Sequence, residues 1–457
     1  MLADKTDVSP PRRRLQWRGG RISKEIDVLR RTAIGSTLAL AAALSLSACG
    51  GGGDDEGTGS KTIQVTLANH VWTENIKAAL PEFEKATGLK VELTQLGEDQ
   101  LSDQYNVKLN AGTSDLDVMM YRPLQEGKLF GKNGYLSDIT EDTKGASDWN
   151  WSDFQSGPVE ATTYDKKVVG VPLITETEVL YYRKDLLAKA GYTAPPKTLD
   201  ELKEAAAKVQ AANPGVAGFV ARTGKTAAVT QFSGFLYSFG GKWADDSGKA
   251  AVNSAEAKQA YAYYGGLIHD HGPKNVSTDM SWPEAMAIFT QGQAAFYTEA
   301  SSLYKNATDP AKSKVAETVG FAPFPEGPAG SKPYNVPSWA LGINEASENK
   351  ANAWKFIEWA TSKEQTLANQ KAGVPGARTS VANDADATST YPKDLVEAAK
   401  AGAENGVGFD RPQVVKVPEA RELVGQPIVD AITGKDSAAA ADKAAEAFQA
   451  LLDDENK

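Results

Sequence analysis

Hydrophobic and polar positions alternate with two different periods along the chain from residue 62 onwards. Residues 62–68 (TIQVTLA) alternate at every second position and are rich in β-branched side chains, a pattern typical of a strand. Residues 74–87 have apolar positions at helical spacing, and residues 100–111 are a second predicted helix. Further strands are predicted over 90–94 and 117–121. This order of strand, helix, strand, helix and strand predicts a parallel α/β sheet.

Both periods continue towards the end of the chain, without a fixed-period repeat. Strand patterns at 294–298 and 318–322 indicate a second sheet, and Thr198 and Ser254 are expected to cap two helices. A chain of 457 residues is too long for one core, so two lobes are expected. Further strands are predicted within 168–182, and further helices over 185–190, 199–210, 254–269, 283–291, 348–360, 364–370, 418–433 and 437–453.

Residues 1–48 differ in composition from the rest of the chain. They carry nine Lys or Arg and four Asp or Glu, and an apolar run of fourteen residues covers 33–46. This run is shorter than the roughly 20 residues that span a bilayer as a helix. A basic segment, a short apolar run and small residues at its end predict a secretory signal peptide over 1–48. The pair Arg30-Arg31 leaves both the general and the twin-arginine export route open.

Cys49 is the only cysteine of the chain, and it follows Leu46, Ser47 and Ala48. This ending resembles the lipobox of bacterial lipoproteins, which implies that the Cys49 sulfur receives a diacylglycerol and that the chain is cut before it. Two or more acyl chains anchor a protein stably to a membrane. Residues 49–60 are therefore expected to be a lipid anchor and a flexible glycine-rich tether. The sequence predicts an extracytoplasmic protein that is held at the cell membrane.

Charge and polar residue types exclude several classes of function. Removing residues 1–48 changes the formal net charge from −10 to −15, and a strongly acidic surface repels nucleic acid. The chain's three histidines form no spaced metal motif, so neither a metal nor another cofactor is predicted. Residues 218–226 (GFVARTGKT) miss the spacing of a phosphate loop by one residue. No G-x-S-x-G nucleophile elbow occurs, but the abundant carboxylate pairs leave a glycosidase open.

Six segments resemble, in order, the sequence blocks of bacterial extracellular solute-binding proteins, in particular the carbohydrate-binding group that serves ATP-driven importers. The likeness runs from Lys61 to about residue 455. The segments are LPEFEKATGLKVEL (80–93), KLNAGTSDLDVMM (108–120), GVPLITETEVLYYRKDLLAKAGYTAPPKTLDELKEAA (170–206), FTQGQAAFYTEAS (289–301), VPSWALGINEASENKANAWKFIEWATSKE (336–364) and GVPGARTS (373–380).

The resemblance implies a periplasmic-binding-protein-like α/β fold, with two α/β lobes and a ligand cleft and hinge between them. The first lobe is expected over 61–171 and 337–385, and the second over 172–336 and 386–457. Closure about the hinge is expected to enclose the ligand. Aromatic rings cover the C–H faces of a sugar, and planar polar side chains bind its hydroxyl groups.

Candidate ligand contacts follow predicted strands, lie in the crossover segment or belong to the later blocks. Core packing, helix capping or a surface ion pair is the alternative for each of them. The resemblance places an acid where this chain has Arg122, so Arg122 indicates either a salt bridge or an acidic ligand. Tyr181 and Tyr182 are predicted to lie in a lobe core. The candidates are His70, Trp72, Glu74, Tyr121, Arg122, Thr175, Glu176, Trp243, Trp282, Glu299, Ser301, Trp339 and Arg378.

The resemblance implies a monomeric solute-binding protein without catalytic activity. It is expected to capture a small carbohydrate or polyol and to deliver it to the permease subunits of an ABC importer in the membrane. Two alternatives remain at this point. One is a surface-anchored glycosidase with two catalytic acids, and the other is a sensor that presents its bound ligand to a receptor.

Overall fold

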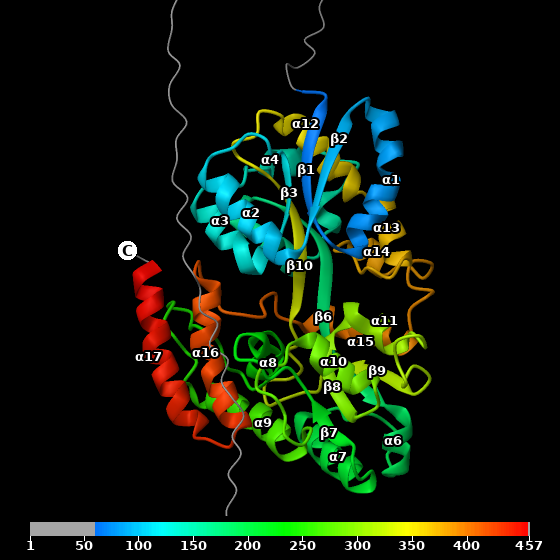
Figure 1. Cartoon of the computed structure of the whole chain (residues 1–457), viewed down its shortest axis with the longest axis vertical. Coiled ribbons are helices and arrows are strands. Elements are labelled where there is room, and N and C mark those ends of the chain that lie inside the picture. The colour runs from blue at the N-terminus through cyan, green and yellow to red at the C-terminus, as the bar shows by residue number, and fades with distance from the viewer. Residues whose placement is uncertain (1–59, 456–457) are drawn as a thin grey trace, which may run out of the picture. The chain divides into compact units, whose positions relative to one another are not determined.

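The computed structural model describes residues 60–455, and two long strands lie at its centre. The strand β6 (Val171–Arg183) pairs with β10 (Asn335–Ile343) over its first half. Over its second half it pairs with β8 (Ala294–Ala300) and β9 (Val319–Pro323). All these pairings are antiparallel. One strand therefore takes part in the sheets of both lobes, and β6 and β10 run from the upper to the lower lobe in Figure 1.

The first lobe is built on parallel strands. β1 (Thr62–Ala68) lies between β2 (Lys90–Leu96) and β3 (Val118–Tyr121) and is parallel to both, because helices connect consecutive strands. β3 pairs antiparallel with β10, and the buried side chains of these strands form one hydrophobic core. The helices of this lobe are α1 (Val71–Thr87), α2 (Glu98–Asn110), α3 (Lys128–Lys132), α4 (Thr140–Gly145), α5 (Ser156–Ala161), α12 (Lys350–Ala360), α13 (Lys363–Lys371) and α14 (Thr379–Ala382).

The second lobe has a sheet of the second half of β6 with β8, β9 and β7 (Ala217–Val220). β7 is parallel to β8, and the main core of the lobe packs between this sheet and the helices. The final helices α16 and α17 lie beside α9 in Figure 1 and contact it. The helices are α6 (Lys184–Lys189), α7 (Leu199–Ala212), α8 (Ala227–Ser238), α9 (Ala255–His271), α10 (Trp282–Thr290), α11 (Tyr304–Thr308), α15 (Lys393–Asn405), α16 (Val417–Ile432) and α17 (Ser437–Glu455).

Most predicted elements are confirmed within a few residues. The side chains of Thr198 and Ser254 accept backbone N–H groups at the starts of α7 and α9, as expected of N-caps. Tyr181 and Tyr182 lie in the core, as predicted. The predicted second sheet is present, because β8, β9 and β7 pair around the second half of β6, and β6 also links this sheet to the strands of the first lobe. The sequence patterns also miss β7, α8 and α15.

The expected signal peptide (1–48), Cys49 and the tether up to residue 59 lie outside the described residues. Within residues 60–455, no helix combines the length and the apolar character needed to cross a bilayer.

Candidate ligand-binding site

The crossing strand β6 separates two polar regions between the lobes. Because successive side chains of a strand point to opposite faces, Thr175 and Thr177 face one region and Glu176 faces the other. The face with the two threonines lines a cavity of about 760 Å³. The Glu176 face carries charged residues from both lobes, which we call the inter-lobe cluster. It comprises Arg122, Glu176, Arg222, Glu299, Asp410, Arg411 and Arg421.

The cavity is lined by α14 and the start of α5 from the first lobe and by α15 from the second. Thr175 and Ser301, two of the predicted ligand contacts, lie in its wall. The Thr175 hydroxyl donates to the carbonyl of Gly376 at 3.1 Å, and the Thr177 hydroxyl donates to Oδ1 of Asn335 at 2.7 Å. These hydroxyl groups therefore hold the crossing strand to its neighbours.

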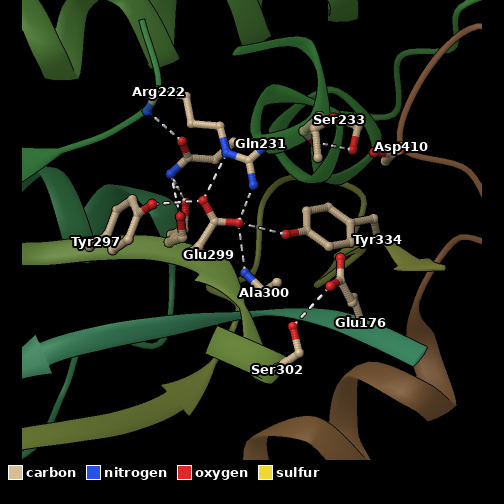
Figure 2. Close-up of polar contacts among 12 residues, drawn as sticks. Glu176, Arg222, Gln231, Ser233, Tyr297, Glu299, Ala300, Ser302, Tyr334 and Asp410 are labelled. Carbon is tan, nitrogen blue, oxygen red and sulfur yellow. Dashed lines mark hydrogen bonds and ion pairs between the residues drawn. The ribbon is translucent and has the colours of Figure 1, made fainter. Parts of the chain in front are cut away.

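Glu299 is the centre of the second-lobe side of the inter-lobe cluster (Figure 2). Its carboxylate accepts Nε and Nη2 of Arg222 at 2.8 and 2.6 Å and the hydroxyls of Tyr297 and Tyr334 at 2.7 and 3.2 Å. The backbone N–H of Ala300 adds a bond of 2.9 Å. Burial alone would raise the pKa of Glu299, but the Arg222 charge and these bonds outweigh it and lower the pKa. Glu299 is therefore saturated by protein donors and positions Arg222.

Glu176 is less fully engaged. Its Oε1 accepts the hydroxyl of Ser302 at 3.0 Å, the one hydrogen bond of its carboxyl group to a described residue (Figure 2). Burial raises the pKa of Glu176 to about 7; the Ser302 bond opposes this shift and the negative charge of Glu299 adds to it. A carboxyl group that is half protonated near neutral pH can both donate to and accept from hydroxyl groups.

Arg122 forms the first-lobe side of the inter-lobe cluster. Its Nη2 donates to Oγ of Ser102 at 2.7 Å and to Glu126 at 2.8 Å, and Nη1 lies 3.3 Å from Glu98. The guanidinium also lies 6.0 Å from the ring centre of Trp339. The salt bridge that was the alternative for Arg122 is therefore present.

Four members of the cluster were not predicted, namely Arg222, Asp410, Arg411 and Arg421. Arg411 donates to both oxygens of Asp410 at 2.6 and 2.5 Å. It also reaches across to Oε1 of Gln125 in the first lobe at 2.8 Å. Burial alone would raise the pKa of Asp410, but the charge of Arg411 outweighs it and lowers the pKa to about 2. Arg411 therefore connects the two lobes at the cluster.

The inter-lobe cluster lies at the carboxyl ends of parallel strands. Arg122 directly follows β3, Arg222 comes two residues after β7, and Glu299 is the penultimate residue of β8. Open α/β sheets bind their ligands outside the carboxyl ends of the strands. On this ground the inter-lobe cluster is a better candidate for the ligand site than the cavity on the other face of β6.

Arg378, a predicted polar contact, is instead fixed in the interior of the first lobe. Its side chain is 1% exposed, with Nε bonded to the carbonyl of Thr361 at 2.9 Å and Nη2 to that of Trp149 at 2.8 Å. Nη1 bonds to Asp153 at 3.2 Å, and the guanidinium lies 4.3 Å from the ring centre of Phe154. The donors of Arg378 are used within the lobe, so its position is that of a structural residue.

The aromatic candidates lie mainly in the cores. Trp72, Tyr121 and Trp339 belong to the first-lobe core and Trp243 to the second-lobe core, and none of them is more than 6% exposed. Trp282 is 38% exposed at the start of α10. Core packing, the alternative considered for these side chains, therefore describes four of the five.

His70 and Glu74 lie at the start of α1. Nδ1 of His70 accepts the backbone N–H of Trp72 at 3.0 Å, and burial lowers the pKa of His70 to about 4. Glu74 is exposed and accepts Nε2 of Gln95 at 2.6 Å. The His70 contact is that of an N-cap, whereas Glu74 does not cap the helix and instead binds a side chain of β2.

Comparison with known proteins identifies the family. Residues 69–367 match the family described as bacterial extracellular solute-binding protein. A probable ABC transporter-binding protein of Deinococcus radiodurans is 32% identical over 300 residues, which cover 64% of this chain and 70% of the relative. The mannitol-binding protein of Pseudomonas aeruginosa is 26% identical, covering 82% of this chain and 89% of the relative. The structure of maltose-bound T. maritima MalE3 has a TM-score of 0.73 at 30% identity and covers 85% of this chain and 100% of that one.

The fold is that of a two-lobed α/β binding protein. The chain belongs to the bacterial extracellular solute-binding protein family, as its sequence blocks indicated. Both sequence relatives are named as binding proteins. In the part of the chain between residues 60 and 455, no three His, Cys, Asp or Glu side chains are grouped to hold a metal ion.

Proposed function

We propose that the protein captures a sugar or sugar alcohol at the inter-lobe cluster and delivers it to the permease subunits of an ABC importer. The observation that carries this proposal is the meeting of carboxylate and guanidinium groups from both lobes at strand ends. Such planar groups bind hydroxyl groups through paired, charge-assisted hydrogen bonds. The mannitol-binding relative and the maltose-bound structure support a ligand of this chemical class.

The proposed ligand contacts are Glu176, Arg122 and Arg421, while Glu299 positions Arg222. Bonds between the lobes at this side support a closing motion over the ligand. Arg411 bonds to Gln125 at 2.8 Å, and Nζ of Lys128 bonds to the carbonyl of Gln413 at 2.8 Å. The protein is expected to act as a monomer, because one chain supplies both lobes.

A glycosidase is the less favoured function. It requires two carboxyl groups that both reach the sugar, one as acid and one as base or nucleophile. Glu176 has the raised pKa of an acid, but the neighbouring Glu299 is fully buried and accepts five hydrogen bonds from the protein. We therefore favour binding without catalysis, in line with the names of the relatives.

A thermal-shift screen over sugars, polyols and sugar acids tests the proposal. A ligand at 100 times its Kd raises the free energy of unfolding by about 2.7 kcal/mol. Glu176→Ala is expected to abolish the shift, whereas Thr175→Val, which changes the neighbouring residue on the opposite face of β6, is expected to retain it. The reverse pattern would move the site to the cavity. No stabilisation by any of these compounds would contradict the proposed function.

The proposal includes export and a lipid anchor at Cys49. Its support is the sequence ending Leu46-Ser47-Ala48-Cys49 and the glycine-rich segment that follows. Cys49→Ser is expected to release the protein from the membrane, because the serine hydroxyl offers no thiol to carry the lipid. Cell fractionation measures this release. A Cys49→Ser protein that stays entirely in the membrane fraction would contradict the anchor.

A further inference from the structure

The arginines of the inter-lobe cluster differ in their partners. Three of them bind a carboxylate, whereas Arg421 forms no ion pair with any residue between 60 and 455. The three pairs are Arg122–Glu126 at 2.8 Å, Arg222–Glu299 at 2.6 Å and Arg411–Asp410 at 2.5 Å.

The partners of Arg421 are neutral oxygens. Its Nε and Nη2 donate to the carbonyl of Thr226 at 2.8 and 2.6 Å, and Nη2 also donates to Oγ1 of Thr230 at 3.0 Å. Within the described chain, Nη1 has no hydrogen bond. The guanidinium is therefore held in place along one edge and keeps donors for another group.

Like charges surround this guanidinium. Nη2 of Arg411 lies 3.4 Å from the same Thr230 hydroxyl, so two guanidinium groups approach one neutral oxygen. Burial and the charge of Arg411 lower the pKa of Arg421 well below its usual range, with Arg222 and Arg122 adding to the effect. The carboxylate of Asp410 opposes the shift, but Arg411 already binds both of its oxygens. An additional anion at this position would offset the cost of the unpaired charge.

We propose that Arg421 binds an anionic group of the ligand, so that the preferred ligand is a polyhydroxylated anion such as a sugar acid or a sugar phosphate. The inference rests on the proposed function, since it names the ligand class of the same site. A guanidinium group binds carboxylate and phosphate oxygens through strong, directional hydrogen bonds. Glu176 remains available for the hydroxyl groups of the ligand, because Ser302 is its one hydrogen-bond partner among the described residues.

Calorimetric titration with matched ligand pairs tests this inference. D-gluconate is compared with D-sorbitol, D-glucuronate with D-glucose, and glucose 6-phosphate with glucose. The wild-type protein is expected to bind at least one anion ten times more tightly than its neutral counterpart. Higher salt is expected to weaken the binding of the anion more than that of the neutral ligand, because salt screens the charge. The uronate and phosphate arms separate the two sources of the charge. Neutral members that bind as tightly as the anions in every pair would overturn the inference and leave the proposed function intact.

Two variants test whether Arg421 is the residue that binds the anionic group. Arg421→Gln is expected to reduce the preference for the anion to about twofold or less, because the anion loses its charged partner and therefore loses more affinity than the neutral ligand. Lys416→Gln removes the same charge from an exposed side chain near the start of α16 and is expected to retain the preference. An equal fall in the affinities of Arg421→Gln for the anionic and the neutral ligand would overturn the inference. If no ligand of any pair bound to the wild type, both the inference and the proposed function would be contradicted.

Discussion

Arg378 and Arg421 both direct a guanidinium group at backbone carbonyl groups, but their surroundings differ. Arg378, in the first-lobe interior, adds the carboxylate of Asp153 at 3.2 Å and a packed aromatic ring. Arg421, in the inter-lobe cluster, adds the hydroxyl of Thr230 at 3.0 Å and the like charge of Arg411. The chain therefore supplies a counter-ion to Arg378 and none to Arg421, although the other three arginines of the inter-lobe cluster each bind a carboxylate.

The difference separates two uses of a buried charge. A charge with its partner and hydrogen bonds in place is costly to disrupt, because removing either partner leaves the other buried and unpaired. A charge without a partner lowers the stability of the unliganded protein and gains from a ligand that brings one. Substitutions at the two arginines and at their neighbours test whether Arg378 and Arg421 differ in this way.

The largest expected effect is on stability. Arg378→Met is expected to lower the free energy of unfolding by about 3–5 kcal/mol, because it leaves Asp153 and two carbonyl groups without their partner. Arg421→Met is expected to change it by less than about 1 kcal/mol, because it removes a charge that has no counter-ion. Urea unfolding of the two variants at pH 7 measures both values. Similar losses in the two would show that Arg421 is as much a part of the fold as Arg378.

A smaller effect is expected from the pH dependence at Glu176. Its pKa of about 7 lies above the ordinary 4.5, so the native state holds a proton that the unfolded chain loses between these values. The stabilisation from this group is therefore complete below about pH 4.5 and is lost as the pH rises through 7. Glu176→Gln mimics the neutral group. As the pH rises from 5 to 8, the free energy of unfolding of this variant is expected to increase by about 1–2 kcal/mol relative to the wild type, allowing for partial exposure of the side chain.

Urea unfolding of both proteins at the two pH values measures this gain. The charges that face Glu176, on Arg222, Glu299 and Asp410, are present in both proteins, so the difference isolates its carboxyl group. A difference between variant and wild type that stays constant with pH would show that the carboxyl group is solvated as an ordinary surface acid.

The smallest expected effect comes from making the inter-lobe cluster resemble the interior. Thr230→Asp places a carboxylate next to Arg421 and Arg411, as Asp153 lies next to Arg378. The affinity for a polyhydroxylated anion is expected to fall at least tenfold, about 1.4 kcal/mol, because the new charge competes for the guanidinium. Calorimetric titration measures the fall, and Thr230→Asn is the control of equal size. An equal loss in both variants would attribute the effect to shape.

The fold follows from the sequence wherever one face of an element is apolar. β1 shows strict alternation and is found over its predicted residues. α8 was missed because it is buried on nearly all sides and so has no amphipathic period. α15 is the exception, because its buried face carries Leu395, Ala398 and Gly402 at helical spacing and its sequence therefore supports a helix that was not predicted.

The candidate site was less predictable, because local patterns do not show which polar side chains meet across a cleft. Arg122 was predicted because it follows a strand, and Glu176 was predicted because it lies in the crossover segment. The same rule would have found Arg222 if the short strand β7 had been predicted. Arg421 lies on a correctly predicted helix, but nothing in that helix marks the side that faces the first lobe. Arg378 was favoured for its motif, whereas its role depends on carbonyl groups that only the folded chain brings together.

The most direct test of the account is a crystal structure of the protein with its tightest ligand from the screen. The two faces of β6 make the outcomes distinct. We expect the ligand on the Glu176 face, with its hydroxyl groups at Glu176 and its anionic group at Arg421. A ligand in the cavity of about 760 Å³, against Thr175 and Thr177, would contradict the assignment of the inter-lobe cluster as the binding site.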